Sequence, residues 1–206
     1  MKGGLMSVFW QGASIGGGLI VAIGAQNTFL LTQALARKHH IMVALVCSLC
    51  DIFLISAGVL GVGNLLSQHE FLLLAARFLG AGFLFFLGWQ ALVRIFKAHA
   101  LDPSERVVTG RKAALLTTLS VTLLNPHAYL DAVIMLGGIA SQYGDEKMLF
   151  AAGALTASVI WFFGLSLGAA RLAPFFSNPR AWQCVDALVV VSMWGIAISL
   201  LVFNPM

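Results

Sequence analysis

The sequence has very few charged residues and no long polar segment. Only 10% of its 206 residues are Asp, Glu, Lys or Arg, whereas 60% are hydrophobic, and the mean hydropathy is +0.93. This composition lies far outside the usual range of soluble domains of this length. No polar stretch is long enough to fold as a domain that reads nucleic acid, despite the net charge of +4. The sequence therefore predicts an integral membrane protein without a nucleic-acid partner, surrounded by the lipid bilayer.

Cysteines are few, and the motifs of energy-coupling enzymes are missing. The three cysteines, Cys47, Cys50 and Cys184, fall in apolar segments, which argues against a disulfide framework. The sequence contains no phosphate-binding loop, kinase motif or phosphorylated-aspartate motif. It offers no paired nucleophile and base beyond His127 with Ser or Cys residues, and such pairs arise easily by chance. We therefore expect neither an enzyme nor a cofactor. Any transport against a gradient would have to draw on an ion gradient.

Short polar clusters divide the chain into six apolar segments. Each is near or above the roughly 20 residues needed to cross about 30 Å of hydrocarbon. The predicted spans are residues 7–35, 41–66, 71–97, 113–140, 148–172 and 182–203. The first is not interpreted as a cleaved signal, because it continues into apolar sequence without a polar region or an Ala-x-Ala-like site. The expected fold class is an all-α integral membrane protein with one transmembrane domain over residues 1–206.

Positive charges are unequally divided between the loops. If successive spans alternate in direction, the first, third and fifth loops carry nine basic residues and all other segments carry three. The nine are Arg37, Lys38, Arg94, Lys97, Arg106, Arg111, Lys112, Arg171 and Arg180, and the three are Lys2, Arg77 and Lys147. Because positive loops stay on the cytoplasmic side, we predict cytoplasmic basic loops and both termini outside.

Three carboxylic acids lie inside predicted spans, where a charge costs roughly 2.5 to 3.5 kcal/mol on insertion scales. Asp51 is about ten residues into the second span, which is about 15 Å and therefore near the midplane. Asp131 follows His127 by four residues, so the two side chains share one helix face. We favour a functional role for Asp51 and Asp131 over that of neutral acids hydrogen-bonded within the bundle. Asp186 is about one turn into the last span, and we interpret it as an acid that reaches the interface or caps the helix.

Asn125 and Pro126 predict an interruption of the fourth span. Proline inside a helix removes a hydrogen-bond donor, but at the first position of a new helix it is favoured, with Asn before it as the N-cap. A restarted half-helix directs free N–H groups at whatever fills the space before it. A simple proline kink is the alternative.

The first span shows a second pattern of this kind at Gly24, Gln26 and Asn27, whereas residues 16–18, all glycine, suit close packing of helices. Asn27 and Asn125 each lie in the first helix of a three-helix half. Because three is an odd number, the halves would run in opposite directions, and their two interrupted helices would meet at a central site.

Other small and polar residues have simpler explanations. Cys47 and Cys50 form a C-x-x-C, which can bind a soft metal ion, but packing against a helix face explains them better. His39 and His40 stand beside Arg37 and Lys38 in a loop, and we expect them to be solvated. The glycines at 58, 61 and 63 suit helix packing within the chain or in a homo-oligomer.

Three stretches together resemble the LysE family of amino-acid exporters. They are GAQNTFLLTQALARKHHIMVALVCSLCD, the later TLLNPHAYLDAVIMLG and then ASVIWFFGLSLGAARLAP, with the N-P-H-x-Y-L-D run as the most specific part. The resemblance covers nearly the whole chain. One departure is that the family usually has Gly-Pro-Gln-Asn where this chain has Ala25 between Gly24 and Gln26.

The resemblance implies a six-helix carrier of the bacterial inner membrane that exports basic amino acids, L-arginine and also L-lysine, driven by protons. The residues it implies are Gln26, Asn27, Asp51, Asn125, Pro126 and Asp131, and His127 joins them through its spacing from Asp131. The remaining alternatives are an exporter of neutral amino acids or related small solutes, and a metal-ion exporter that uses Cys47, Cys50 and His127.

Overall fold

The computed structural model describes residues 2–21, 24–61, 70–96, 107–174 and 179–202, and the structural statements below concern this part of the chain. Every regular element within these ranges is a helix, as the composition predicts. The elements are α1 (Lys2–Val21), α2 (Ala25–Leu35), α3 (His40–Val59), α5 (Glu70–Phe96), α6 (Arg111–Leu123), α7 (Pro126–Tyr129), the π-helix η2 (Leu130–Met135), α8 (Leu136–Ser141), the 3-10 helix η3 (Gly144–Glu146), α9 (Lys147–Leu172) and α10 (Pro179–Val202).

Several of these helices have the length and composition of membrane spans. His40–Val59 and Gly144–Leu172 each qualify alone, and Met6–Val21 with Ala25–Leu35 forms a third candidate whose two parts are bent by 73°. Shorter apolar helices occupy Ala81–Phe96, Leu130–Ser141 and Gln183–Ile198. These apolar helices are those of a multi-pass membrane protein.

The second helix is shorter than the span predicted for it. α3 ends at Val59, where residues 41–66 were expected, because the chain turns at Leu60 and Gly61. Gly61 has a φ of +97°, a left-handed conformation that glycine adopts without a steric penalty. Residues 62–66 lie outside the described part of the chain.

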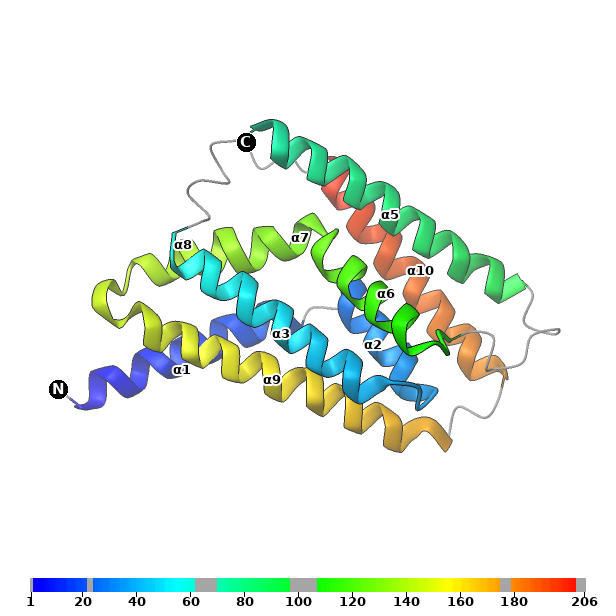
Figure 1. Ribbon diagram of the computed structural model, residues 1–206, viewed down its shortest axis with the longest axis horizontal. Coiled ribbons are helices and arrows are strands. Elements are labelled where there is room, and N and C mark those ends of the chain that lie inside the picture. Colours follow the sequence, from blue (N-terminus) through cyan, green and yellow to red (C-terminus); the bar gives the residue numbers. More distant parts are fainter. Residues whose placement is uncertain (1, 22–23, 62–69, 97–106, 175–178, 203–206) are drawn as a thin grey trace.

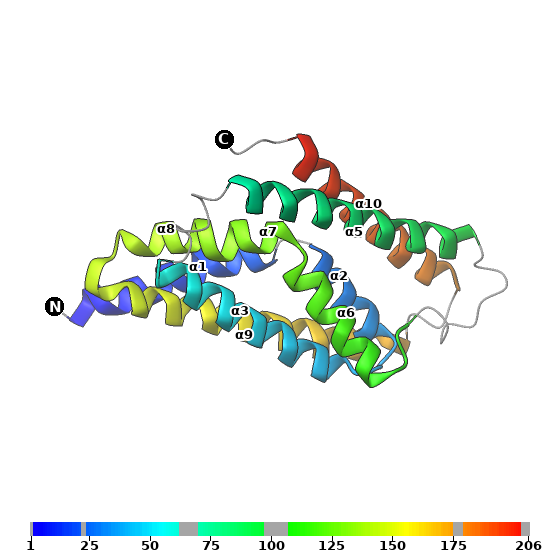
Figure 2. The same ribbon diagram turned by 45° about the horizontal axis from the view of Figure 1, so that its top comes forward.

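The helices pack in two groups with the interrupted segments between them. α9 packs along α1 and α3, and α5 packs along α10 on the other side of the molecule (Figure 1). α2 contacts α9, α6 and α10, whereas α3 contacts α6, η2 and α8. The view in Figure 2 shows α2, α6 and α7 crossing the space between the two groups.

The end of the molecule where α2, α5 and α9 finish is cross-linked by hydrogen bonds, and we call it the basic end. Arg37 Nε donates to the Ala170 carbonyl (2.9 Å), His39 Nε2 to the Thr109 carbonyl (2.9 Å) and Gln33 Nε2 to the Val108 carbonyl (3.3 Å). The exposed basic residues here are Arg37, Lys38, Arg111, Lys112 and Arg171. All three loops expected to be basic therefore reach the same end.

The two loop histidines are not simply solvated, and that expectation was wrong. Both are half-buried. His39 bonds to Thr109, and the His40 Nδ1 shares a 2.8 Å hydrogen bond with the buried Ser166 hydroxyl of α9. The histidines therefore help to hold the basic end together.

Glycines bring backbones together at two helix crossings. A Cβ at Gly16 of α1 would lie 2.6 Å from the Ala154 Cβ of α9, so the close packing predicted for this glycine is confirmed. A Cβ at Gly137 of α8 would lie 2.5 Å from the Gly58 carbonyl oxygen of α3. Gly58 thus packs against a helix of its own chain.

The crossing of α3 and α8 can be tested with neighbouring glycines. We expect Gly137→Ala to lower the melting temperature of the detergent-solubilised protein, because overpacking typically costs about 1–3 kcal/mol and here the obstacle is backbone. Gly138→Ala is the matched control, since a Cβ there meets nothing within 4 Å. Equal melting temperatures for the two variants would contradict the packing described.

Candidate functional site

The first helix is interrupted, as the sequence predicts. α1 ends at Val21 and α2 begins at Ala25, after Gly24 in an extended conformation (φ −105°, ψ −178°). The Asn27 Nδ2 donates to the Ile20 carbonyl (2.7 Å), and the Thr28 hydroxyl donates to the Gly24 carbonyl (2.8 Å). The Asn27 side chain thus satisfies a carbonyl freed at the end of α1, whereas Thr28 bonds to the N-cap carbonyl of its own helix, which also accepts the Thr28 N–H. This explains how the interruption forms with Ala25 at the position of the family proline.

The second interruption also lies where the sequence predicts it. α6 ends at Leu123, and α7 begins with Pro126 at its first position. The Asn125 carbonyl accepts from the Ala128 N–H (3.1 Å), and the Tyr129 hydroxyl donates to the Leu123 carbonyl (2.9 Å). The helix therefore ends and restarts, and a kink in one continuous helix does not describe it.

The two interruptions are closed in the same way. In each, a side chain from the first turns of the new helix reaches back to a carbonyl at the end of the old one: Asn27 to Ile20 and Tyr129 to Leu123. Such bonds are required because unpaired backbone groups cost several kcal/mol away from water. Asn27 and Tyr129 are thus positioning residues for the two breaks.

Helix α9 supports the polar groups of α2 and α3. Asp51 lies in the middle of α3 and is only 7% exposed, and its Oδ2 accepts a hydrogen bond from the Ser158 hydroxyl (2.8 Å). One turn further along α9, Trp161 Nε1 donates to the Asn27 Oδ1 (3.1 Å). α9 therefore fixes both the acid of α3 and the side chain that closes the first interruption.

One cavity of about 130 Å³ brings most of the predicted site residues together. Its lining includes Gln26, Asn27, Asp51, Asn125 and Asp131. Because a water molecule needs only about 10–15 Å³ of such volume, the cavity has room for several. Both interruptions and both acids therefore face the same space.

Two predicted site residues, Pro126 and His127, are not among the cavity residues named above. Pro126 is the first residue of α7, the position that the sequence predicts for it. The side chain of His127 lies outside the described part of the structure. Its predicted sharing of a helix face with Asp131 remains a prediction, and the π-helix that begins at Leu130 departs from the α-helical spacing on which it rests.

Gln26 offers hydrogen-bond donors to the cavity. Its Nε2 is buried and makes no hydrogen bond of good geometry with the described residues, although the amide lies near Asp51 and Cys47. The first N–H groups of α2 belong to residues 25–27, which line the cavity and have no partner within the helix by the geometry of a helix N-terminus. This wall of the cavity therefore suits an anionic group, whereas Asp51 and Asp131 suit a cationic one.

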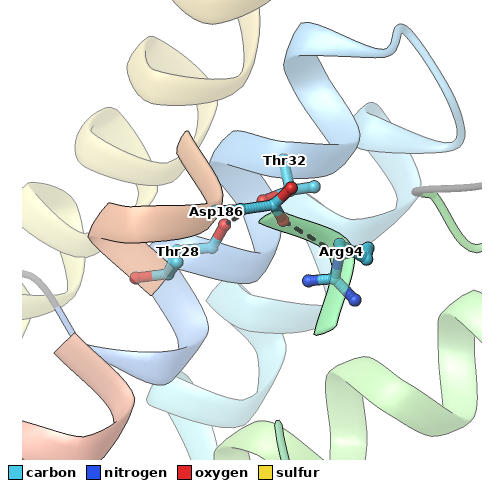
Figure 3. A network of polar contacts seen from close by, with 4 residues as sticks. All are labelled: Thr28, Thr32, Arg94 and Asp186. Carbon is cyan, nitrogen blue, oxygen red and sulfur yellow. Dashed lines mark hydrogen bonds and ion pairs between the residues drawn. The ribbon is translucent and has the colours of Figure 1, made fainter. Parts of the chain in front are cut away.

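Asp186 is not the interfacial or capping acid that the sequence suggests. It is 2% exposed, and its Oδ1 accepts from Arg94 Nε of α5 (2.9 Å). Figure 3 shows this pair beside Thr28 and Thr32 of α2. The roles of Ser158, Trp161 and Tyr129 were not predicted from the sequence, although a tryptophan or tyrosine inside an apolar span is a signal that its polar atom has a partner nearby.

Water access to the cavity can be tested by thiol labelling. In a background with Cys47, Cys50 and Cys184 replaced by alanine, Ala128→Cys should react rapidly with a small cationic methanethiosulfonate, because Ala128 lines the cavity beside Asp131. Ala154→Cys is the control, since Ala154 is fully buried between α1 and α9. Similar rates at both positions would contradict a water-accessible cavity.

Comparison with known proteins identifies the family of the chain. Residues 18–203 match the family described as LysE type translocator. The chain is 43% identical over 198 residues to the arginine exporter protein ArgO of Pectobacterium carotovorum subsp. carotovorum, which covers 95% of this chain and 97% of the relative. It is 40% identical, with the same coverage, to the arginine exporter protein ArgO of Serratia proteamaculans. No solved structure matches the chain. The chain belongs to the LysE family of translocators.

Proposed function

We propose that this protein exports basic amino acids, L-arginine and also L-lysine, from the cytoplasm of a bacterium across its inner membrane. The observation that carries the proposal is the cavity in which two interrupted helices meet two acids. The relatives named as arginine exporters, which match over nearly the whole chain, support the choice of substrate.

The cavity offers complementary groups for both ends of such a substrate. Arginine and lysine are zwitterions with an additional cation, so a site for them needs donors for a carboxylate and acceptors for a guanidinium or an ammonium. The Gln26 amide and the N-terminus of α2 are the proposed donors. Asp51 and Asp131 are the proposed acceptors, held through Ser158 and through η2.

Export of a cation requires an energy source. Moving one positive charge outward against an interior-negative potential costs about 2.3 kcal/mol per 100 mV. We propose proton antiport, in which one ionised acid of the cavity binds the substrate cation on the cytoplasmic side and takes up a proton on the outer side as the substrate leaves. Exchange of one proton for one such cation moves no net charge, so the potential would not oppose it.

We propose six spans in two inverted halves, with α1–α2, α3 and α5 in one half and α6–α8, α9 and α10 in the other. Three observations support this. α3 begins at the basic end and α9 finishes there, and α5 and α10 are opposed in the same way (Figure 1). Each interrupted helix packs against the middle helix of the other half. Asn27 and Tyr129 close the two breaks alike.

The structure gives less support to a metal-ion exporter or to an exporter of neutral amino acids than to an exporter of basic amino acids. Among the described residues, no three His, Cys, Asp or Glu side chains are grouped to hold a metal ion, so a metal exporter gains no support. An exporter of neutral amino acids would have no use for two acids in its cavity except to carry protons. Measuring which of these substrates competes with arginine for export distinguishes the three possibilities.

The acids can be tested in cells that lack other exporters of basic amino acids. Efflux of preloaded radiolabelled arginine by the wild-type protein should be abolished by a protonophore. We expect Asp51→Asn and Asp131→Asn each to reduce it at least about tenfold, because a charged hydrogen bond is worth about 1.5–3 kcal/mol.

The control for these variants is Asp145→Asn, an exposed acid in η3 at the end opposite the basic end. It should export arginine at the wild-type rate. If both cavity variants also retained wild-type efflux, the proposed binding and coupling would be wrong. Efflux of neutral amino acids in place of arginine would favour the alternative substrate class.

Orientation gives a separate prediction. We propose that the basic end faces the cytoplasm, in line with the excess of basic loops there. Alkaline phosphatase fused after the last residue should then be active, and green fluorescent protein at the same position should be dark. The reverse pattern would place the C-terminus in the cytoplasm and contradict the proposed orientation.

A further inference from the structure

The ion pair between Arg94 and Asp186 lies outside the cavity lining and has no place in the mechanism proposed above. The Asp186 side chain is 3% exposed and that of Arg94 is 23% exposed. The carboxylate is therefore sealed within the protein, while the arginine that covers it reaches the surface. Buried charges in membrane proteins are costly and are usually functional.

The pair lies at the basic end. Arg94 is in the last turn of α5, and Asp186 follows Val185, which packs with Ala34, Val107 and Ala169 of the same end. The acid is thus on the side of the molecule where we propose that the substrate enters.

Helix α2 connects the pair to the cavity. Thr28 and Thr32 lie beside Asp186 (Figure 3), and Asn27, the residue before Thr28, lines the cavity. The Thr32 hydroxyl donates to the Thr28 carbonyl, and the Thr28 hydroxyl donates to that of Gly24, another lining residue. Two threonines of α2 therefore lie beside the ion pair, and Thr28 is next in sequence to a residue that lines the cavity.

The group that Asp186 holds is a guanidinium, which is also the side-chain group of free arginine. A carboxylate placed to accept the Nε–H of Arg94 offers the same contact to a substrate guanidinium. The ammonium of lysine is a compact and strongly hydrated charge that does not reproduce this planar geometry. Exchange of one guanidinium for another would also leave the buried carboxylate paired throughout.

We propose that Asp186 is a second cation-binding residue for the substrate, met before the central cavity, and that Arg94 occupies it until arginine displaces Arg94. This inference rests on the proposed function. It assigns to Asp186 a preference for arginine over lysine, and to Arg94 the role of a competing internal ligand.

The test is the initial uptake of labelled arginine into everted membrane vesicles, in which the cytoplasmic face is outside. Asp186→Asn should raise the KM for arginine about tenfold or more, since it removes a charged hydrogen bond. Arg94→Gln should lower the KM, because it removes the competitor and keeps the acid. An ion pair that only holds α5 to α10 would give shifts of the same sign in both variants, which would overturn the inference.

Two further variants serve as controls for the measured changes in KM. The double variant Arg94→Gln/Asp186→Asn has no unpaired charge and should retain the raised KM of Asp186→Asn, whereas a return to the wild-type KM would make the pair purely structural and overturn the inference. Arg171→Gln removes an exposed charge at the same end and should leave the KM unchanged. Absence of arginine uptake by the wild-type protein would instead refute the proposed function, and this inference with it.

Discussion

The rest of this structure depends on the need to satisfy peptide groups that two interrupted helices expose at membrane depth. Lipid offers these groups no partners, so irregular backbone persists there only where protein or a water-filled cavity receives it. The chain meets this requirement with Asn27 and Tyr129, which bond to carbonyls of the preceding helices. The N–H groups at the start of α2 are left facing the cavity. The two interruptions leave backbone groups without partners in their own helices, and these groups form part of the polar lining of the cavity.

Helix α9 holds the polar side chains around the interruptions in place. Through Ser158 and Trp161 it holds Asp51 and Asn27, and through Gly153 and Ala154 it packs closely against α1. A long apolar helix with few charges thus fixes the positions of the polar groups on two neighbours. The proposed transport cycle would need these contacts to change in concert, because α9 touches both the interrupted first helix and the acid-bearing α3.

The sequence predicted those features that are written locally. Asn125 followed by Pro126 predicted that a new helix starts there. Gly24 with Gln26 and Asn27 predicted the first interruption, although this segment contains no proline. The convergence of Asp51 and Asp131 on one cavity followed from the resemblance and is found in the structure. The burial of Asp186 was missed because the position of a residue along its own helix does not show which neighbouring helix covers its side chain. Here Arg94 of α5 covers it. The contacts of His39 and His40 were missed because their partners lie 70 and 126 residues away in the sequence, at Thr109 before α6 and at Ser166 in α9.

Where Gly58 of α3 meets Gly137 of α8, two backbones touch with no Cβ between them. Small residues let two backbones approach closely, because no side chain separates them. Gly58 also faces the carbonyls of Ala132 and Val133 in η2, so this close contact extends to the residue next to Asp131. The two glycines thus determine how near α3 the wall of the cavity that carries Asp131 can lie.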